Sequence, residues 1–126
     1  MIMERFELFM GCLGNGLTVC NSAVTEHGDY KQIAHISNGG KIKWYVPVTS
    51  IPGPALLRIE HTADAMHQNA RQAIERGLAT DKARTYYRML NALPESVFLR
   101  FIHETKPDTD DETKMAMLTD LYLEYA

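Results

Sequence analysis

The sequence has 126 residues, of which 45% are hydrophobic and 23% are charged, and its formal net charge is −3. These values are typical of a single globular domain, residues 1–126, with a core large enough to fold without a metal ion or a disulfide. They argue against a protein that is basic throughout, and no apolar run approaches the roughly 20 residues of a membrane-spanning helix.

The N-terminal run MIMERFELFMG bears on the compartment. Glu4 and Glu7 interrupt its apolar residues and no basic residues precede them, whereas a secretory signal needs a basic start and an apolar centre. We therefore expect a cytoplasmic protein with no membrane partner. Cys12 and Cys20 are then expected to be reduced thiols that pack as small apolar side chains, and a nucleophilic or metal-binding cysteine is the alternative.

Residues 4–13 place apolar side chains at alternate positions, which is typical of a strand with one buried face. A second β-prone run follows the turn residues Asn15 and Gly16. If these two residues form the whole turn, residue i pairs with residue 31 − i, and Cys12 faces Val19. The two cysteines then lie on opposite faces of the hairpin.

A second hairpin is predicted around Asn38, Gly39 and Gly40, because Gly and Asn accept the backbone angles of tight turns. A two-residue loop would pair Ile33 and His35 with Trp44 and Ile42. A three-residue loop is favoured because it gathers a cleaner apolar face. That face contains Tyr30, Ala34, Ile36, Ile42, Trp44 and Val46, and Trp44 is expected to be buried as its anchor.

The opposite face of this hairpin is a candidate binding surface. It carries basic residues and a tyrosine, namely Lys31, His35, Lys41, Lys43 and Tyr45. Lysine can contact phosphate and tyrosine can stack on a base, so this face suits a nucleic acid. The alternative is an ordinary solvated sheet face.

After Pro54 the sequence changes to a helical period. The pattern predicts a helix over residues 54–76, with Pro54 in its first turn and Gly77 as its C-terminal cap. Its apolar stripe is Leu56, Ile59, Ala63, Met66, Ala70, Ala73 and Gly77, and the part from Leu56 to Ala70 is expected to lie on the sheet. The same helix carries Glu60, Asp64 and His67 on one face, a weak candidate for a metal site whose alternative is a solvated face. We expect no metal ion and no cofactor.

Two further helices are predicted, the first of which begins at Thr80 or Asp81. Its expected apolar side is Ala83, Tyr86, Tyr87, Leu90 and Leu93. The next helix follows Pro94 with Val97, Phe98, Phe101 and Ile102. Basic residues gather between Arg71 and Arg88, and Arg84 and Arg88 are candidates for contact with phosphate or an acidic protein surface. An ordinary solvated helix surface is the alternative.

Residues 107–126 predict a last, acidic helix. Thr109 and Glu112 have the spacing of a capping box, and the segment carries six acidic residues and one lysine. An apolar stripe is expected to dock this helix on the rest of the domain. Its members are Met115, Leu118, Leu121, Tyr122 and Tyr125.

The expected fold class is α+β, with a four-stranded antiparallel β-meander of two hairpins over residues 1–50. Three to four α-helices over residues 54–126 are expected to pack on one face of this sheet. The change from a period of two residues to a period of 3.6 residues after Pro54 carries this prediction.

The sequences GCLGNGLTVCNSAVTEHGDYKQIAHISNGGKIKWYV and IPGPALLRIEHTAD resemble those of small proteins encoded on bacterial mobile elements and phages. The resemblance covers about the first half of the chain. It implies a setting in which small proteins often bind proteins of the host or of the element.

No common catalytic, nucleotide-binding or metal-binding motif occurs in the sequence. We therefore expect a non-catalytic binding protein, an adaptor or inhibitor that acts on a protein partner. The first alternative is a nucleic-acid-binding protein that uses the basic sheet face or the basic helix. The second alternative is a small metal-dependent enzyme.

Overall fold

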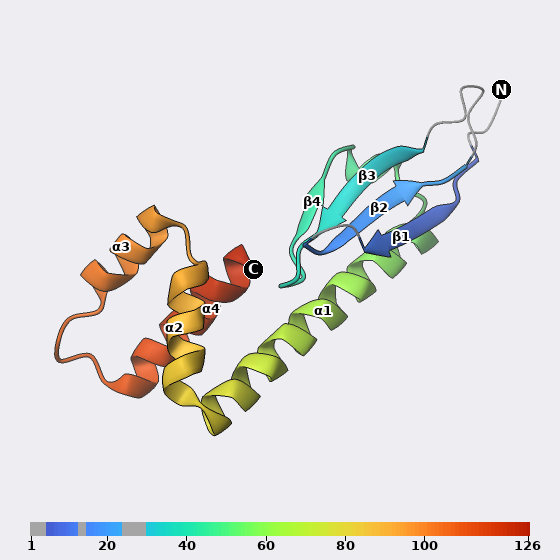
Figure 1. Ribbon diagram of the computed structural model, residues 1–126. Coiled ribbons are helices and arrows are strands. Elements are labelled where there is room, and N and C mark those ends of the chain that lie inside the picture. Colours follow the sequence, from blue (N-terminus) through green and yellow to red (C-terminus); the bar gives the residue numbers. More distant parts are fainter. Residues whose placement is uncertain (1–4, 13–14, 24–29) are drawn as a thin grey trace. The chain divides into compact units, whose positions relative to one another are not determined.

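The computed structural model describes residues 5–12, 15–23 and 30–126 (Figure 1). Four strands form one antiparallel sheet in the order β1-β2-β3-β4, and four α-helices follow. The predicted α+β class is confirmed. The elements are β1 (Leu8–Cys12), β2 (Leu17–Asn21), β3 (Lys31–Ile36), β4 (Ile42–Trp44), a 3-10 turn η1 (Val48–Ser50), α1 (Gly53–Thr80), α2 (Lys82–Ala92), α3 (Glu95–Glu104) and α4 (Asp111–Tyr125).

The chain divides into two compact units, Met1–Met66 and His67–Ala126, whose boundary lies inside α1. Each unit has an apolar core of its own. Among the described helices, only α1 contributes to the core of the sheet, whereas α2, α3 and α4 build the second core with the C-terminal part of α1. The sequence did not indicate this division, and the interpretation as a single domain stays a prediction.

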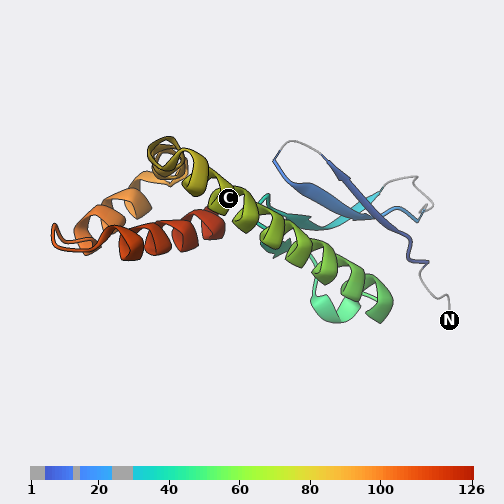
Figure 2. The ribbon, with the colours of Figure 1, turned by 90° about the horizontal axis from the view of Figure 1, so that it is seen from below.

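One face of the sheet, which we call the inner face, packs on the N-terminal part of α1 (Figure 2). Val19 and Ile36 from the strands and Ile59 from the helix are fully buried there. Each such side chain contributes about 1.5–3 kcal/mol through burial of apolar surface. Trp44 is only partly buried, which corrects its expected role as the anchor. It lies on β4, which is last in the strand order and has only β3 as a neighbour among the described strands.

The β1–β2 hairpin has a longer loop than predicted. Residue i faces residue 29 − i, so that Cys12 faces Leu17 instead of Val19. Four residues separate Cys12 from Leu17, so the predicted two-residue turn is wrong. Two of the four, residues 13 and 14, lie outside the described residues. Gly16 has a φ of 106°, and a Cβ atom there would collide with the carbonyl oxygen of Ile36. Cys12 and Cys20 still lie on opposite faces.

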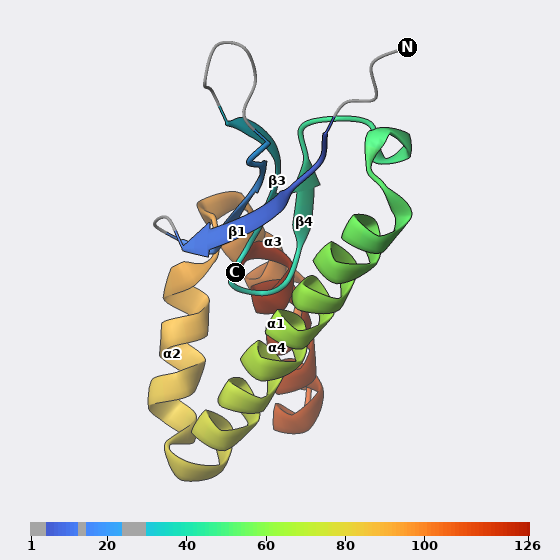
Figure 3. The ribbon, with the colours of Figure 1, turned by 90° about the vertical axis from the view of Figure 1, so that its right-hand side faces the viewer.

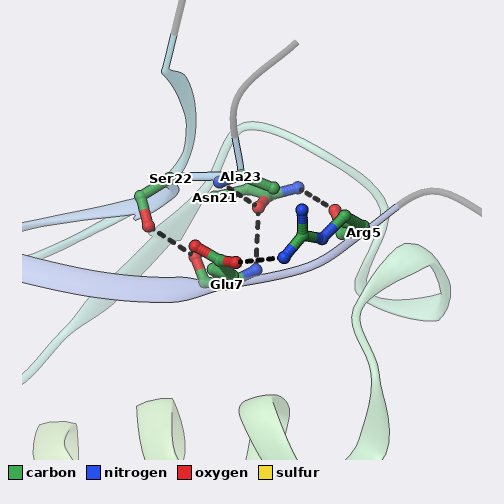
Figure 4. Close-up of polar contacts among 5 residues, drawn as sticks. All are labelled: Arg5, Glu7, Asn21, Ser22 and Ala23. Atoms are coloured by element: carbon green, nitrogen blue, oxygen red, sulfur yellow. Dashed lines mark hydrogen bonds and ion pairs between the residues drawn. The ribbon is translucent and has the colours of Figure 1, made fainter.

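Polar contacts at the other end of this hairpin hold its register (Figure 4). The Oδ1 atom of Asn21 accepts hydrogen bonds from the backbone N–H of Glu7 at 3.0 Å and of Ala23 at 3.1 Å. Its side-chain amide donates to the carbonyl of Arg5, and the N–H of Ser22 donates to the carbonyl of Glu7 at 2.8 Å. These side-chain contacts span 14 and 16 residues, so the turn residues alone do not reveal them.

The β3–β4 hairpin has the predicted three-residue loop. Ala34 faces Trp44 and Ile36 faces Ile42. Ser37 closes the loop, because its N–H donates to the carbonyl of Lys41 at 2.9 Å and its hydroxyl accepts from the N–H of the same residue.

A β-bulge interrupts β3. Val19 faces Ala34, but the next residue of β2, Cys20, faces Gln32, so that Ile33 has no partner on β2. Ile33 and Ala34 are therefore buried consecutively. In the residues before the bulge, the positions that would otherwise point to the inner face point away from it. Tyr30 is one of them and is 72% exposed. The prediction that Tyr30 joins the apolar face is wrong for this reason.

The helix α1 runs through Gly77 to Thr80, so its predicted end at residue 76 and the capping role of Gly77 are wrong. The N–H of Asp81 donates to the carbonyl of Gly77 at 2.8 Å, as in a continuing helix. Gly77 serves close packing instead. A Cβ atom at this position would lie 2.6 Å from the hydroxyl oxygen of Thr85 on α2.

The apolar stripe of α1 also departs from the predicted one. Ile74 is buried and Ala73 is exposed. The predicted stripe alternated steps of three and four residues, a period of 3.5, whereas an α-helix has 3.6 residues per turn. The buried side therefore drifts along the 28 residues of the helix.

The helix α2 begins after Asp81 as predicted, and the carboxylate of that residue accepts a hydrogen bond from the N–H of Arg84 at 3.3 Å. Its buried side contains Thr85, Met89 and Leu90, whereas the expected core residues Ala83 and Tyr87 are exposed.

The last two helices complete the second core. Phe101 of α3 is fully buried, and Ile102, expected on the same side, is exposed. Leu118 and Leu123 of α4 are buried beside it, so the predicted docking of the last helix is confirmed. Asp110, instead of Thr109, caps α4 by accepting from the N–H of Thr113 at 3.2 Å. Hydrogen bonding to Thr113 lowers the pKa of the Asp110 carboxyl.

Candidate binding surfaces

The face of the sheet opposite α1, here called the outer face, is the first candidate surface. Strand pairing assigns one set of alternate side chains to this face. These residues are Phe9, Gly11, Thr18, Cys20, Gln32, His35, Lys43 and Tyr45, with Lys41 in the adjoining loop. None of them belongs to the buried core, so their side chains are the groups that this face of the sheet presents outside the core.

Tyr45 and Lys43 form the chemically most distinctive part of the outer face. The Tyr45 side chain is 49% exposed, and the ammonium of Lys43 lies 5.7 Å from the centre of its ring. This distance allows a cation–π attraction, which holds the lysine beside the ring. His35 faces Lys43 on the neighbouring strand. An aromatic ring thus lies among basic groups.

Of the five residues predicted for this face, Lys31 does not share it. The bulge at Ile33 shifts the register, so that Lys31 faces Asn21. Asn21 follows Cys20 on β2, and neighbouring residues of a strand point to opposite faces, so Asn21 and Lys31 lie on the inner-face side. Lys41, Lys43, His35 and Tyr45 remain. The basic part of the outer face is therefore smaller than the sequence indicated.

Phe9 is a surface residue that sequence reasoning did not single out. It is 56% exposed, and its ring atoms lie 3.0 Å and 3.2 Å from where a Cβ of Gly11 would be. The ring thus covers the backbone at Gly11 on the same face. The alternation of residues 4–13 already placed Phe9 opposite the apolar side, and this was the available signal.

The second candidate surface is one side of α2. Arg84, Tyr87, Arg88 and Asn91 recur at helical spacing, are exposed, and line a hollow together with Thr85. Within the part of the chain that the structure describes, neither guanidinium forms an ion pair. Both remain available to an anion.

The other basic residues of this segment are placed differently. Arg71 pairs with Asp120 at 3.5 Å and Lys82 pairs with Asp111 at 3.8 Å, and both partners belong to the acidic last helix. The predicted basic cluster is therefore divided between Arg71 and Lys82, which pair with acids of α4, and Arg84 and Arg88, which form no ion pair among the described residues.

Tyr86 and Tyr87 differ although they are neighbours. Their rings meet edge to face, with centres 5.6 Å apart and planes at 77°. Tyr86 packs against the second core, and burial, followed by the charges of Tyr87 and Asp111, raises the pKa of its hydroxyl. Tyr87 is exposed, and the contact with Tyr86 orients it.

The candidate metal site is not assembled. Among the residues that the structure describes, no three His, Cys, Asp or Glu side chains lie close enough to hold a metal ion, and this includes Glu60, Asp64 and His67. Glu60 and Asp64 are exposed side chains of α1.

Comparison with known proteins adds no assignment: no family model, no curated protein and no solved structure matches the chain. No helix in the described ranges is long and apolar enough to cross a membrane.

Proposed function

We propose that the chain is a non-catalytic binding protein that uses the outer face of its sheet to bind a protein partner. The observation that carries the proposal is Tyr45, a half-exposed ring with the Lys43 ammonium beside it. Tyrosine is enriched at protein interfaces because it combines a large apolar area with a polar end at low entropic cost.

The charge of the outer face indicates what the partner offers. Lys41, Lys43 and His35 lie on the same face as the ring, and the Lys43 ammonium is 5.7 Å from its centre. Glu7, which precedes β1, is paired with Arg5 at 3.2 Å. A complementary surface therefore has an apolar centre and acidic groups around it. A mobile-element or phage setting, a role as adaptor or inhibitor, and a cytoplasmic location belong to the same proposal.

The change Tyr45→Ala tests it. We expect the protein immobilised on beads to recover about tenfold less of its partner from host lysate, or less still, because aromatic side chains carry a large part of interface energy. The matched control is Tyr125→Ala, which removes a comparably exposed tyrosine on α4, outside the sheet, and should leave recovery unchanged. Quantitative mass spectrometry measures the recovered proteins. Equal recovery by both variants and the unaltered protein would contradict the proposal.

Nucleic-acid binding is the second candidate function, and the arginines of α2 favour it. Arg84 and Arg88 lie one helical turn apart with the exposed Tyr87 between them, an arrangement that suits phosphate contact and base stacking. The sheet face favours it less, since Lys31 is not on it.

Changing Arg84 and Arg88 together to alanine tests the second candidate. If both contact phosphate, the slope of log affinity against log salt concentration should fall by about 1.4, because each contact to a single strand contributes about 0.7. Gel shifts with single-stranded oligonucleotides at several salt concentrations measure this slope. Arg58 and Arg76, changed together, remove the same charge elsewhere and serve as the control. An identical slope for both double variants would rule out this use of α2.

A further inference from the structure

The outer edge of β1 offers backbone groups that no described strand uses. β1 is an end strand in the order β1-β2-β3-β4, and Figure 3 shows it as the front strand of the sheet. Its sequence is LFMGC. End strands of natural sheets usually carry lysine, proline or an inward charge that prevents pairing with another chain, and β1 has none of these within its bounds.

The hydrogen-bond pattern shows which groups point outward. The N–H of Ser22 donates to the carbonyl of Glu7, so Glu7 is directed toward β2. In an antiparallel pair this direction alternates, so Phe9 and Gly11 are also directed toward β2. The backbone N–H and C=O groups of the intervening residues then point away from the sheet. These residues are Leu8, Met10 and Cys12.

We propose that two copies of the chain dimerise by antiparallel pairing of β1 with β1 about a twofold axis at Met10. Residue i of one copy then faces residue 20 − i of the other, so that Met10 faces Met10 and Leu8 faces Cys12. Each copy supplies three donors and three acceptors, and all twelve groups are used in six hydrogen bonds. The twofold axis is perpendicular to the sheet, so the inner faces of both copies lie on the same side.

The side chains support a second copy as the occupant of this edge. In the proposed register Phe9 faces Gly11 of the other copy across a non-hydrogen-bonded pair, where side chains approach most closely. The ring of each copy covers Gly11 of its own strand, and that Gly11 faces Phe9 of the other copy, so the two rings lie side by side across the twofold axis. A second copy therefore supplies an exposed aromatic ring that matches the exposed ring of the first, and Gly11 leaves room for both.

On the inner-face side, the proposed pairing continues an apolar row. Leu8 is half-buried and Cys12 is exposed in the isolated sheet, and each would lie beside the other across the new pair. Apolar surface that is open to water in one copy becomes buried between two. The proposal needs Phe9 and the β1 edge, and it does not involve Tyr45, which lies at the opposite end of the sheet.

Sedimentation of the full chain tests the dimer. We expect the mass to rise from 14.3 kDa toward twice that value as the protein concentration increases. Phe9→Lys places a charge at the pair and should weaken dimerisation at least about tenfold, since edge lysines oppose strand pairing. The matched control, Leu99→Lys, changes an equally exposed apolar residue on α3 and should leave the dimerisation constant unchanged. A monomer at every concentration would overturn the proposal.

A cross-link tests the register independently. In the change Leu8→Cys, the new thiol faces the natural Cys12 of the other copy, at a strand separation that a disulfide can bridge. Within one copy the two positions are four residues apart on one strand, too far for a bond. We expect mild oxidation to give a disulfide-linked dimer on a non-reducing gel, with the unaltered protein and Leu99→Cys as controls. Failure of Leu8→Cys to cross-link beyond these controls would refute the register.

Discussion

Replacing Phe101 with alanine should lower the free energy of unfolding by about 3–5 kcal/mol, which is the range for truncating a large buried aromatic side chain. Phe101 is fully buried in the second core, where it lies with Leu118 and Leu123 of α4. The alanine loses the transfer free energy of the ring and leaves a cavity that the surrounding helices fill only in part. Urea denaturation followed by circular dichroism measures the loss.

Leu99 provides the matched control for this change. It lies two residues away on the same helix α3 but is 57% exposed. Leu99→Ala should therefore shift the unfolding free energy by no more than about 0.5 kcal/mol, as at most surface positions. Similar losses for both variants would mean that α3 does not present Phe101 to the core.

Replacing Gly77 with alanine should destabilise the second unit by about 1–3 kcal/mol, although alanine favours a helix interior over glycine by about 1 kcal/mol. The added Cβ would lie 2.6 Å from the Oγ1 atom and 3.0 Å from the Cγ2 atom of Thr85. Thr85 is buried, so its side chain has little room to move, and α1 and α2 must separate. Thermal unfolding of the variant measures the effect.

A second change at Thr85 separates this clash from other causes. Thr85→Ala removes both crowded atoms, so the variant with both changes should be more stable than the sum of the two single effects indicates. Gly53→Ala is the control for glycine replacement in α1, because a Cβ at Gly53 meets nothing within 4 Å. If Gly77→Ala is as stable as the unaltered protein, the close approach of α2 does not require glycine.

Local signals were sufficient for the elements of the fold. Alternation and turn residues marked the hairpins, and Pro54 marked the change to helix. The cap at Asp81 was also predicted, because its chemistry involves residues only three positions apart. The division into two cores was not predictable, since an apolar stripe shows that a helix face is buried but not which element covers it.

The errors of register have long-range causes. The turn at Asn15 and Gly16 suggested a two-residue loop, whereas the Asn21 side chain reaches across the hairpin to residues far away in sequence. Gly77 was predicted to end the helix because glycine is common at helix C-termini. Its small size is instead required by the close approach of Thr85 on the next helix. In both cases a side chain that is distant in sequence determines the local structure: Asn21 for the hairpin and Thr85 for the helix.

The candidate surfaces were predictable only as far as they depend on residues that are close in sequence. Lys41, Lys43 and Tyr45 follow a tight turn, and their common face could be derived from alternation. Arg84 and Arg88 share a helix side by spacing alone. Which cations are paired depends on the last helix, whose Asp111 and Asp120 hold Lys82 and Arg71. Sequence spacing within one helix carries no information about such a partner.

The single extra residue at Ile33 illustrates how a sheet can acquire a new surface during evolution. Exchanging the two faces of a strand by substitution would require a coordinated change at every position. One inserted residue exchanges the faces of only the part of the strand that precedes it, here Lys31 and Gln32, and leaves the pairing of Ala34 to Ile36 with β4 intact. Relatives that differ by one residue at this point would present different chemistry from nearly the same sequence.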